Sequence, residues 1–158
     1  MGQPVLRCWL PDEDATCRLG AELAASCPGG SGLLLTLRGE LGAGKSTLAR
    51  ALLRGLGASG TIRSPTYTLA EPYSTTEGPV LHMDLYRLAG ADELESLGYR
   101  DWREQHRLLI VEWPERAGGS LGPIDLDLEL TYSGSGREAR LEARSDPGKA
   151  WLRALRTA

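Results

Sequence analysis

The hydrophobic positions of this 158-residue chain group into short continuous runs, strict alternations and helical repeats. Residues 33–37 (LLLTL) and 108–111 (LLIV) are short apolar runs, which are typical of strands buried on both faces of a parallel sheet. After the first run, apolar side chains at positions 48, 51, 52 and 56 recur at helical spacing. Strands that alternate with helices along the chain in this way predict an α/β fold. In such a fold, helices cover both faces of a mostly parallel central sheet and give three layers.

The C-terminal part of the chain has a different pattern. Residues 124–132 (IDLDLELTY) and 137–144 (REARLEAR) alternate between apolar and polar side chains, and a Ser-Gly-Ser-Gly turn separates them. This pattern predicts an antiparallel hairpin with one buried face. Asp146 and Pro147 then begin a closing helix that contains Trp151. Because no repeat or linker interrupts the sequence, we expect a single domain over residues 1–158.

The remaining segments complete the expected order of elements. Residues 61–69 (TIRSPTYTL) form a proline-containing turn that leads into a β-rich stretch. Five further elements are expected, namely a strand over 4–10, a helix beginning at Asp12 and ending by Pro28, a strand over 79–85, and two short helices over 91–97 and 99–106.

Composition places the chain among ordinary globular proteins, with 41% hydrophobic and 25% charged residues. A net charge of −3 and a pI near 5.5 argue against a broad nucleic-acid-binding face. The three cysteines include no C-x-x-C pair, which favours reduced thiols over disulfides or a metal site. We expect a cytoplasmic protein, because no signal peptide opens the chain and no run approaches the roughly 20 apolar residues of a membrane helix.

Between the first apolar run and the helical repeat lies the sequence GELGAGKS, residues 39–46, which fits the P-loop pattern G-x-x-x-x-G-K-[ST]. Glycines let the backbone turn successive N–H groups toward a phosphate chain, and the following helix presents its free N-terminal donors to the same anion. We expect Lys45 to reach the β- and γ-phosphates and Ser46 to bind Mg²⁺. A plain glycine-rich turn is the alternative, but the strand–loop–helix context favours a nucleoside triphosphate site.

Two carboxylates at strand ends are candidates for the chemistry. Glu112 directly follows the apolar run 108–111, as in a Walker B strand, and Asp84 lies near the end of the expected strand 79–85. Ligands of open α/β sheets bind outside the carboxyl ends of the strands, so both acids are well placed. We assign Glu112 to the metal and Asp84 to orienting water or a loop, although the two compete for the metal role.

A threonine, two histidines and two arginines are further polar candidates. Thr66 lies in the segment after the P-loop helix, where a mobile loop can sense the γ-phosphate, and a simple turn is the alternative. His82 and His106 are isolated histidines, and we interpret both as having no chemical role. We find no evident arginine finger, and Arg63 and Arg87 are the candidates.

Four blocks of this sequence together resemble the bacterial TsaE family, the small ATPases required to make threonylcarbamoyladenosine in tRNA. The blocks are GELGAGKST, SPTYTLAEPY, HMDLYRL and VEWPE, and the similarity extends from LPDEDAT to the GREARLEA hairpin. Two departures are mild, since Met83 stands where the family usually has Phe and Ser46 stands where Thr is common. The resemblance implies a P-loop NTPase fold, and as partners the TsaD and TsaB subunits of the threonylcarbamoyl transferase complex, with indirect contact to tRNA.

The resemblance also assigns site residues. It implies that ATP is the nucleotide and that Ser46 and Glu112 occupy magnesium-ligand positions. Thr66, Asp84 and Trp113 would occupy positions important for ATP hydrolysis, and without the resemblance Trp113 would be interpreted as a core or interface residue. The implied ATP-binding residues are Asp12, Thr16, Leu41, Gly42, Ala43, Gly44, Lys45, Ser46 and Thr47, with Asp12–Thr16 near the adenine.

Two alternatives to a partner-coupled ATPase stay open at this point. A small-molecule kinase would need an acceptor pocket and an arginine-rich lid, for which residues 100–107 are a weak candidate. A nucleotide-gated binding module would use ATP only to order residues 61–69. A GTPase is disfavoured because the sequence contains no N-K-x-D motif.

Overall fold

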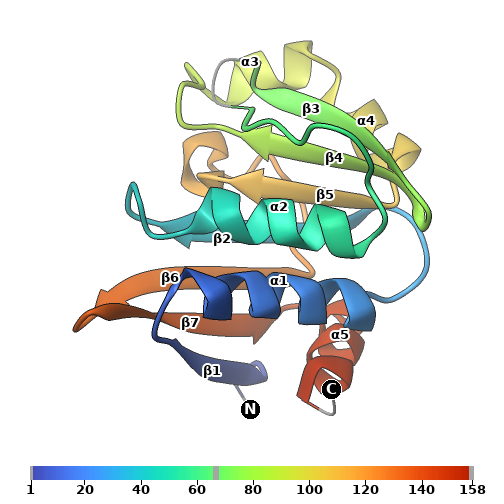
Figure 1. Cartoon of the computed structure of the whole chain (residues 1–158). Helices are drawn as coiled ribbons and strands as arrows, with labels where there is room; N and C mark the ends of the chain where they lie inside the picture. Colours follow the sequence, from blue (N-terminus) through green and yellow to red (C-terminus); the bar gives the residue numbers. More distant parts are fainter. Residues whose placement is uncertain (1, 66–67, 157–158) are drawn as a thin grey trace.

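The computed structural model describes residues 2–65 and 68–156 of the chain. Within these residues, one sheet of seven strands runs through the molecule in the order β1-β7-β6-β2-β5-β4-β3 (Figure 1). The strands are β1 (Val5–Leu10), β2 (Leu33–Gly39), β3 (Ala70–Thr75), β4 (Gly78–Asp84), β5 (Leu108–Glu112), β6 (Leu126–Ser133) and β7 (Gly136–Ala143).

The centre of the sheet is parallel and its edges are antiparallel. Strand β2 pairs in parallel with β5 on one side and β6 on the other, and β4 pairs in parallel with β5. Strand β7 joins β6 and β1 antiparallel, and β3 joins β4 antiparallel. Leu34, Leu35 and Leu37 of β2 are fully buried, as expected for a central strand covered on both faces. The predicted fold class, with a mostly parallel centre and a C-terminal hairpin, is confirmed.

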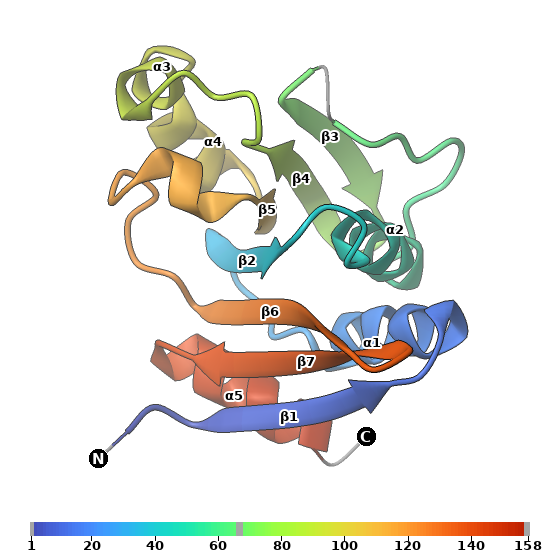
Figure 2. The same ribbon diagram turned by 90° about the vertical axis from the view of Figure 1, so that its left-hand side faces the viewer.

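Helices cover both faces of the sheet and give the fold three layers (Figure 1, Figure 2). One face has a core that includes Leu35, and the other has a core that includes Leu34. No helix within residues 2–65 and 68–156 is long and apolar enough to cross a membrane. The first face carries α1 (Glu13–Ser26), α2 (Lys45–Gly55) and α5 (Asp146–Arg156), and the second carries α3 (Ala91–Ser96), α4 (Tyr99–Gln105) and the 3₁₀ helix η1 (Pro114–Ala117).

The segment after α2 was predicted as a turn over residues 61–69 that leads into a β-rich stretch, and residues 66–67 of it lie outside the described residues. Residues 61–65 adopt no helix or strand, and strand β3 begins at Ala70. Strand β3 pairs with β4 at the edge of the sheet, where Pro72 is tolerated. Its sequence AEPYST has little apolar alternation, so the pairing with β4 rather than local pattern defines the strand.

Two glycines allow α1 to approach α2 closely. A Cβ on Gly20 would lie 2.6 Å from the Cβ of Ala51, and a Cβ on Gly55 would lie 2.5 Å from the Cβ of Ala24. Real carbon atoms do not approach this closely, so the two helices can pack in this way only because both positions lack side chains. The contact holds the start of α1 beside the loop that precedes α2.

Candidate functional site

The predicted phosphate loop has the expected strand–loop–helix setting. Strand β2 ends at Gly39 and helix α2 begins at Lys45. Gly42 and Gly44 have φ angles of 79° and 110°, a region that side chains with a Cβ strongly disfavour. The two glycines therefore permit the tight curl between the end of β2 and the N-terminus of α2, a geometry that suits anion binding.

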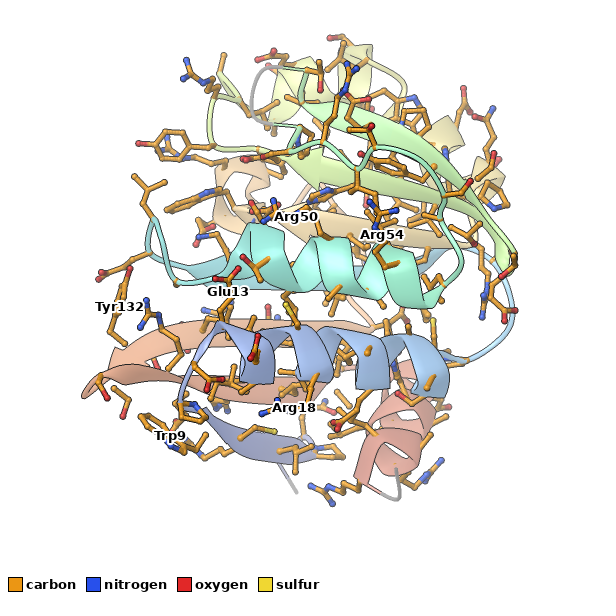
Figure 3. All side chains as sticks on the ribbon, in the orientation of Figure 1. Trp9, Glu13, Arg18, Arg50, Arg54 and Tyr132 are labelled. Carbon is orange, nitrogen blue, oxygen red and sulfur yellow. The ribbon has the colours of Figure 1, made fainter. Side chains whose placement is uncertain are left out.

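The carbonyl groups at the tip of this loop are held by the hairpin β6–β7. The Tyr132 hydroxyl donates to the Leu41 carbonyl at 2.9 Å, and Arg137 Nη2 donates to the Gly42 carbonyl at 3.4 Å. The Arg137 guanidinium also lies 4.1 Å from the centre of the Tyr132 ring. Figure 3 shows Tyr132 on the same side of the molecule as the loop before α2. Because a trans peptide directs its N–H away from its C=O, anchoring the Leu41 carbonyl fixes the direction of the Gly42 N–H.

Lys45 is nearly fully buried, with 4% of its surface exposed. Its Nζ donates to the carbonyls of Gly39 at 2.5 Å and Glu40 at 3.0 Å, and it lies 4.3 Å from the centre of the Trp113 ring. Burial lowers the pKa of this ammonium group, and the nearby Glu112 carboxylate acts in the opposite direction. The ammonium group thus lies within the loop, on acceptors that a phosphate can replace.

Ser46 and Glu112 meet at the start of α2. The Ser46 hydroxyl donates to Glu112 Oε1 at 3.1 Å, with Oε2 at 3.4 Å, and Glu112 is 2% exposed. The structure therefore brings together the two side chains that we assigned to Mg²⁺. Hard oxygen donors of this kind suit Mg²⁺, which usually takes one or two protein ligands in addition to phosphates and water. In the part of the chain described here, no group of three or more His, Cys, Asp or Glu residues forms a self-contained metal site.

Asp84 lies beside Glu112 but has different surroundings. The two residues are register partners in the parallel pair β4–β5. Asp84 Oδ1 accepts the N–H of Tyr86 at 2.9 Å. Burial raises the pKa of Asp84, the Tyr86 N–H opposes this, and the charge of Glu112 adds to the rise. Asp84 is thus a carboxylate at the phosphate-loop end of the sheet, and its charged form is disfavoured by burial and by the charge of Glu112.

Trp113 stands at the junction of the site with η1. Its φ angle of 57° is uncommon for a residue other than glycine, and its ring centre lies 5.0 Å from that of Tyr86. The sequence resemblance alone suggested Trp113, and the structure places its ring against the Lys45 ammonium. Thr66, the third residue that the resemblance assigned to hydrolysis beside Asp84 and Trp113, lies outside the described residues.

Two adjoining cavities form a cleft along the loop. One has a volume of about 250 Å³ and the other about 380 Å³, and both are lined by Gly42, Gly44 and Thr47. All of the ATP-binding residues that we predicted line one or both cavities. The smaller cavity is also lined by Leu10, Pro11, Asp12, Glu13, Thr16, Ala43, Ser135, Gly136 and Arg137, and the larger by Leu41, Lys45, Ser46, Asp84, Tyr86, Arg87, Glu112 and Trp113.

Asp12 and Thr16 lie at the α1 side of the smaller cavity. Asp12 Oδ1 accepts the N–H of Ala15 at 2.9 Å and so caps α1, which is the structural role that its position in the sequence indicates. Thr16 is buried, and its Cγ2 lies near the backbone of Gly44. The smaller cavity therefore joins the start of α1 to the phosphate loop.

Three residues at the site were missed in the sequence. Tyr132 and Arg137 pair with each other at the end of the hairpin, in phase with its apolar positions, and local pattern does not reveal that the fold carries them to the loop. His82 is fully buried and its Nε2 lies 2.6 Å from Glu112 Oε2, which corrects our interpretation of an isolated histidine. A signal was available, because strand alternation places His82 on the same face as Asp84.

Comparison with known proteins adds independent information. Residues 10–141 match the family model of the threonylcarbamoyl adenosine biosynthesis protein TsaE. The chain is 38% identical over 144 residues to a Haemophilus influenzae protein named tRNA threonylcarbamoyladenosine biosynthesis protein TsaE, covering 89% of this chain and 91% of that protein. An Aquifex aeolicus protein of the same name is 37% identical over 123 residues, covering 77% and 83%. The crystal structure of Bacillus subtilis YdiB superposes with a TM-score of 0.82 at 25% identity, covering 99% of this chain and 97% of that one.

Proposed function

This chain belongs to the TsaE family of threonylcarbamoyl adenosine biosynthesis proteins, and we propose that it is a Mg²⁺-dependent ATPase serving the formation of threonylcarbamoyladenosine in tRNA. The family membership supports the pathway. The ATPase activity is supported by one observation above all, namely the Ser46–Glu112 pair at the phosphate loop, with Lys45 and Asp84 in the same cavity.

Nucleotide binding follows from the groups that line the cleft. The loop N–H groups and the N-terminus of α2 take the phosphates, while the smaller cavity beside Asp12 and Thr16 takes the base and ribose. Lys45 exchanges the carbonyls of Gly39 and Glu40 for phosphate oxygens. This exchange of neutral acceptors for charged ones strengthens its hydrogen bonds.

Hydrolysis requires positioning and charge neutralisation more than covalent chemistry. Ser46 and Glu112 would hold Mg²⁺, which neutralises negative charge on the phosphates when it is bound. Asp84 lines the same cavity and orients the attacking water through its carboxylate. Its fixed hydrogen bond from the Tyr86 N–H limits how far the carboxylate can turn.

We further propose that turnover is coupled to the TsaD and TsaB subunits of the transferase complex. Arg87 lines the larger cavity, so the chain itself places one of the two candidate arginine fingers beside the phosphate loop. The backbone of Arg63, our other candidate, is held by the Tyr73 hydroxyl at 2.9 and 3.1 Å. A partner that orders these groups around the phosphates would raise the rate of an otherwise slow ATPase.

The structure argues against the small-molecule kinase, because its candidate lid, residues 100–107, lies far from the phosphate loop. Arg103 donates to the carbonyls of Gly32, Leu121 and Pro123, and Arg107 donates to those of Pro28 and Glu77. These residues lie near the starts of β2 and β5, at the opposite end of the parallel strands from the phosphate loop. Arg103 and Arg107 therefore connect the loops at the end of the sheet opposite the phosphate loop. They are not placed to form an arginine lid over a nucleotide.

The experiment that tests the proposal is phosphate release from Mg-ATP, measured with the chain alone and with TsaB, TsaD and tRNA. We expect slow release alone and strong stimulation by the complex. Tight binding of ATP without turnover under either condition would refute the ATPase and leave a nucleotide-gated binding module.

A further inference from the structure

A buried imidazole stands behind Glu112, and the proposed function leaves it without a task. His82 of β4 is fully buried, and its Nε2 lies 2.6 Å from Glu112 Oε2. The other carboxylate oxygen, Oε1, faces the Ser46 hydroxyl at 3.1 Å. We propose that His82 is a positioning residue that holds the Glu112 carboxylate toward Ser46 and thereby sets the Mg²⁺ affinity of the nucleotide complex. This inference rests on the proposed function.

The geometry defines the direction of the hydrogen bond. The Glu112 carboxylate is an acceptor, so the hydrogen lies on Nε2 of His82, because the other tautomer would oppose two lone pairs at 2.6 Å. Within the described residues, His82 Nδ1 is buried and has no hydrogen-bond partner. A histidine retained only for packing is expected to satisfy both nitrogens or to be replaced by an apolar residue. Among the residues that the structure describes, the one hydrogen-bond partner of this ring is Glu112.

The strand register explains why the imidazole approaches from inside the sheet. His82 pairs with Ile110, and Asp84 pairs with Glu112, so His82 lies one side-chain position further from the phosphate loop on the same face. It reaches the carboxylate from the preceding side-chain position of the neighbouring strand. The His82 ring thus contacts only Oε2, whereas the Ser46 hydroxyl lies closer to Oε1, at 3.1 Å, than to Oε2, at 3.4 Å.

Anchoring matters because a glutamate side chain has several rotatable bonds. A free carboxylate at this position would sample several orientations, and binding a cation would then require that freedom to be lost. Hydrogen-bond partners behind a ligating group commonly change metal affinity by about 10- to 100-fold. His82 fixes the carboxylate before the metal arrives.

The test compares His82→Leu, which removes the donor, with His82→Gln, which retains an N–H donor. The readout is the affinity for ATP by titration calorimetry, measured across a range of Mg²⁺ concentrations and in EDTA. We expect His82→Leu to raise the Mg²⁺ concentration for half-maximal tightening by about 10- to 100-fold, with unchanged affinity for ATP in EDTA. We expect His82→Gln to restore most of the loss. His106→Leu is the matched control, since that ring is held by the Trp102 carbonyl on α4.

Two outcomes would overturn the inference. A folded His82→Leu variant with unaltered Mg²⁺ dependence refutes the positioning role while the proposed function stands. A wild-type chain that binds ATP equally well with and without Mg²⁺ refutes both. If His82→Leu fails to fold, ¹⁵N NMR of the wild-type imidazoles decides, with His106 as the internal reference, because the chain has only two histidines. We expect hydrogen on Nε2 of His82, and hydrogen on Nδ1 alone would overturn the assignment.

Discussion

Asp84 and Glu112 are register partners at the ends of two adjacent parallel strands, so the fold places two carboxylates side by side at the phosphate loop. Their surroundings separate their tasks. Glu112 contacts Ser46 and His82 through its two oxygens, whereas Asp84 is held by the N–H of Tyr86. This difference supports the division of labour proposed from the sequence, with Glu112 on the metal and Asp84 on the water.

The charge of Glu112 is predicted to be essential for Mg²⁺-dependent turnover. Glu112→Gln keeps the shape of the side chain and an oxygen that can accept from His82, but it removes the charge that attracts the cation. We expect phosphate release to fall by about 100-fold, with the midpoint of thermal unfolding almost unchanged. If Glu112→Gln turns over at the wild-type rate at limiting Mg²⁺, then Glu112 is not the metal ligand.

The charge of Asp84 is predicted to lower the stability of the fold at neutral pH while it supports activity. Burial raises its pKa, so the folded chain binds the proton more tightly than the unfolded chain, and the free energy of unfolding falls as the pH rises above about 4. Asp84→Asn carries no charge, so at pH 7 it should unfold at a higher temperature than the wild type. This advantage should shrink as the pH approaches 4.

The same variant should lose activity. We expect phosphate release by Asp84→Asn to fall by about 100-fold, the usual contribution of a group that orients or deprotonates a nucleophile. Thermal unfolding at pH 7 and pH 4, together with the rate of phosphate release, checks both parts. A variant that is less stable than the wild type at pH 7 would show that the Asp84 charge is well compensated in the fold.

The hairpin contact to the phosphate loop is predicted to matter for nucleotide affinity. Tyr132→Phe removes only the hydroxyl that donates to the Leu41 carbonyl, a hydrogen bond worth about 1 kcal/mol. We therefore expect ATP to bind up to about fivefold more weakly, because the loop must then be ordered when ATP binds, with at most about 1 kcal/mol lost in stability since the Tyr132 side chain is half exposed. Glu138→Gln is the matched control on the same hairpin, since its partner Arg7 lies on β1. Equal losses in both variants would indicate a general effect of altering the hairpin.

The α1–α2 contact gives a prediction about stability. Replacing a glycine inside a helix by alanine ordinarily stabilises the helix by about 1 kcal/mol. At Gly20 the new Cβ would lie 2.6 Å from the Cβ of Ala51, so Gly20→Ala should instead destabilise the fold by about 1–3 kcal/mol. Gly29→Ala, where no atom lies within 4 Å of the new Cβ, should be nearly neutral. Urea unfolding of the two variants measures the difference, and a stabilised Gly20→Ala would show that α1 can move.

The sequence specified the elements whose pattern is local. Residues 108–112 form β5 as predicted, because a continuous apolar run that ends in an acid has few other solutions in an α/β fold. The phosphate loop and both strand-end carboxylates were also found in this way. The bounds of strand β3 were not predicted, because its short sequence contains Pro72 and the strand depends on pairing with β4.

Contacts between distant segments were beyond a single sequence. Tyr132 lies 91 residues from Leu41 in the chain, and no local pattern records their hydrogen bond. His82 and Glu112 are 30 residues apart and meet only because β4 and β5 are neighbours in the sheet. The proposed role of His82 depends on such a long-range contact, whereas the nucleotide site was predicted from motifs that are continuous in the sequence.

The measurement that tests the central claim most directly is titration calorimetry of ATP, in Mg²⁺, against the wild type and Lys45→Ala. Lys45 is buried in the phosphate loop and is expected to move to the β- and γ-phosphates, so its removal should weaken ATP binding by about 10- to 100-fold. AMP, which lacks those phosphates, should bind both proteins with equal weakness. Equal affinity of the wild type and Lys45→Ala for ATP would contradict the account, because the cleft along the loop would then not be a triphosphate site.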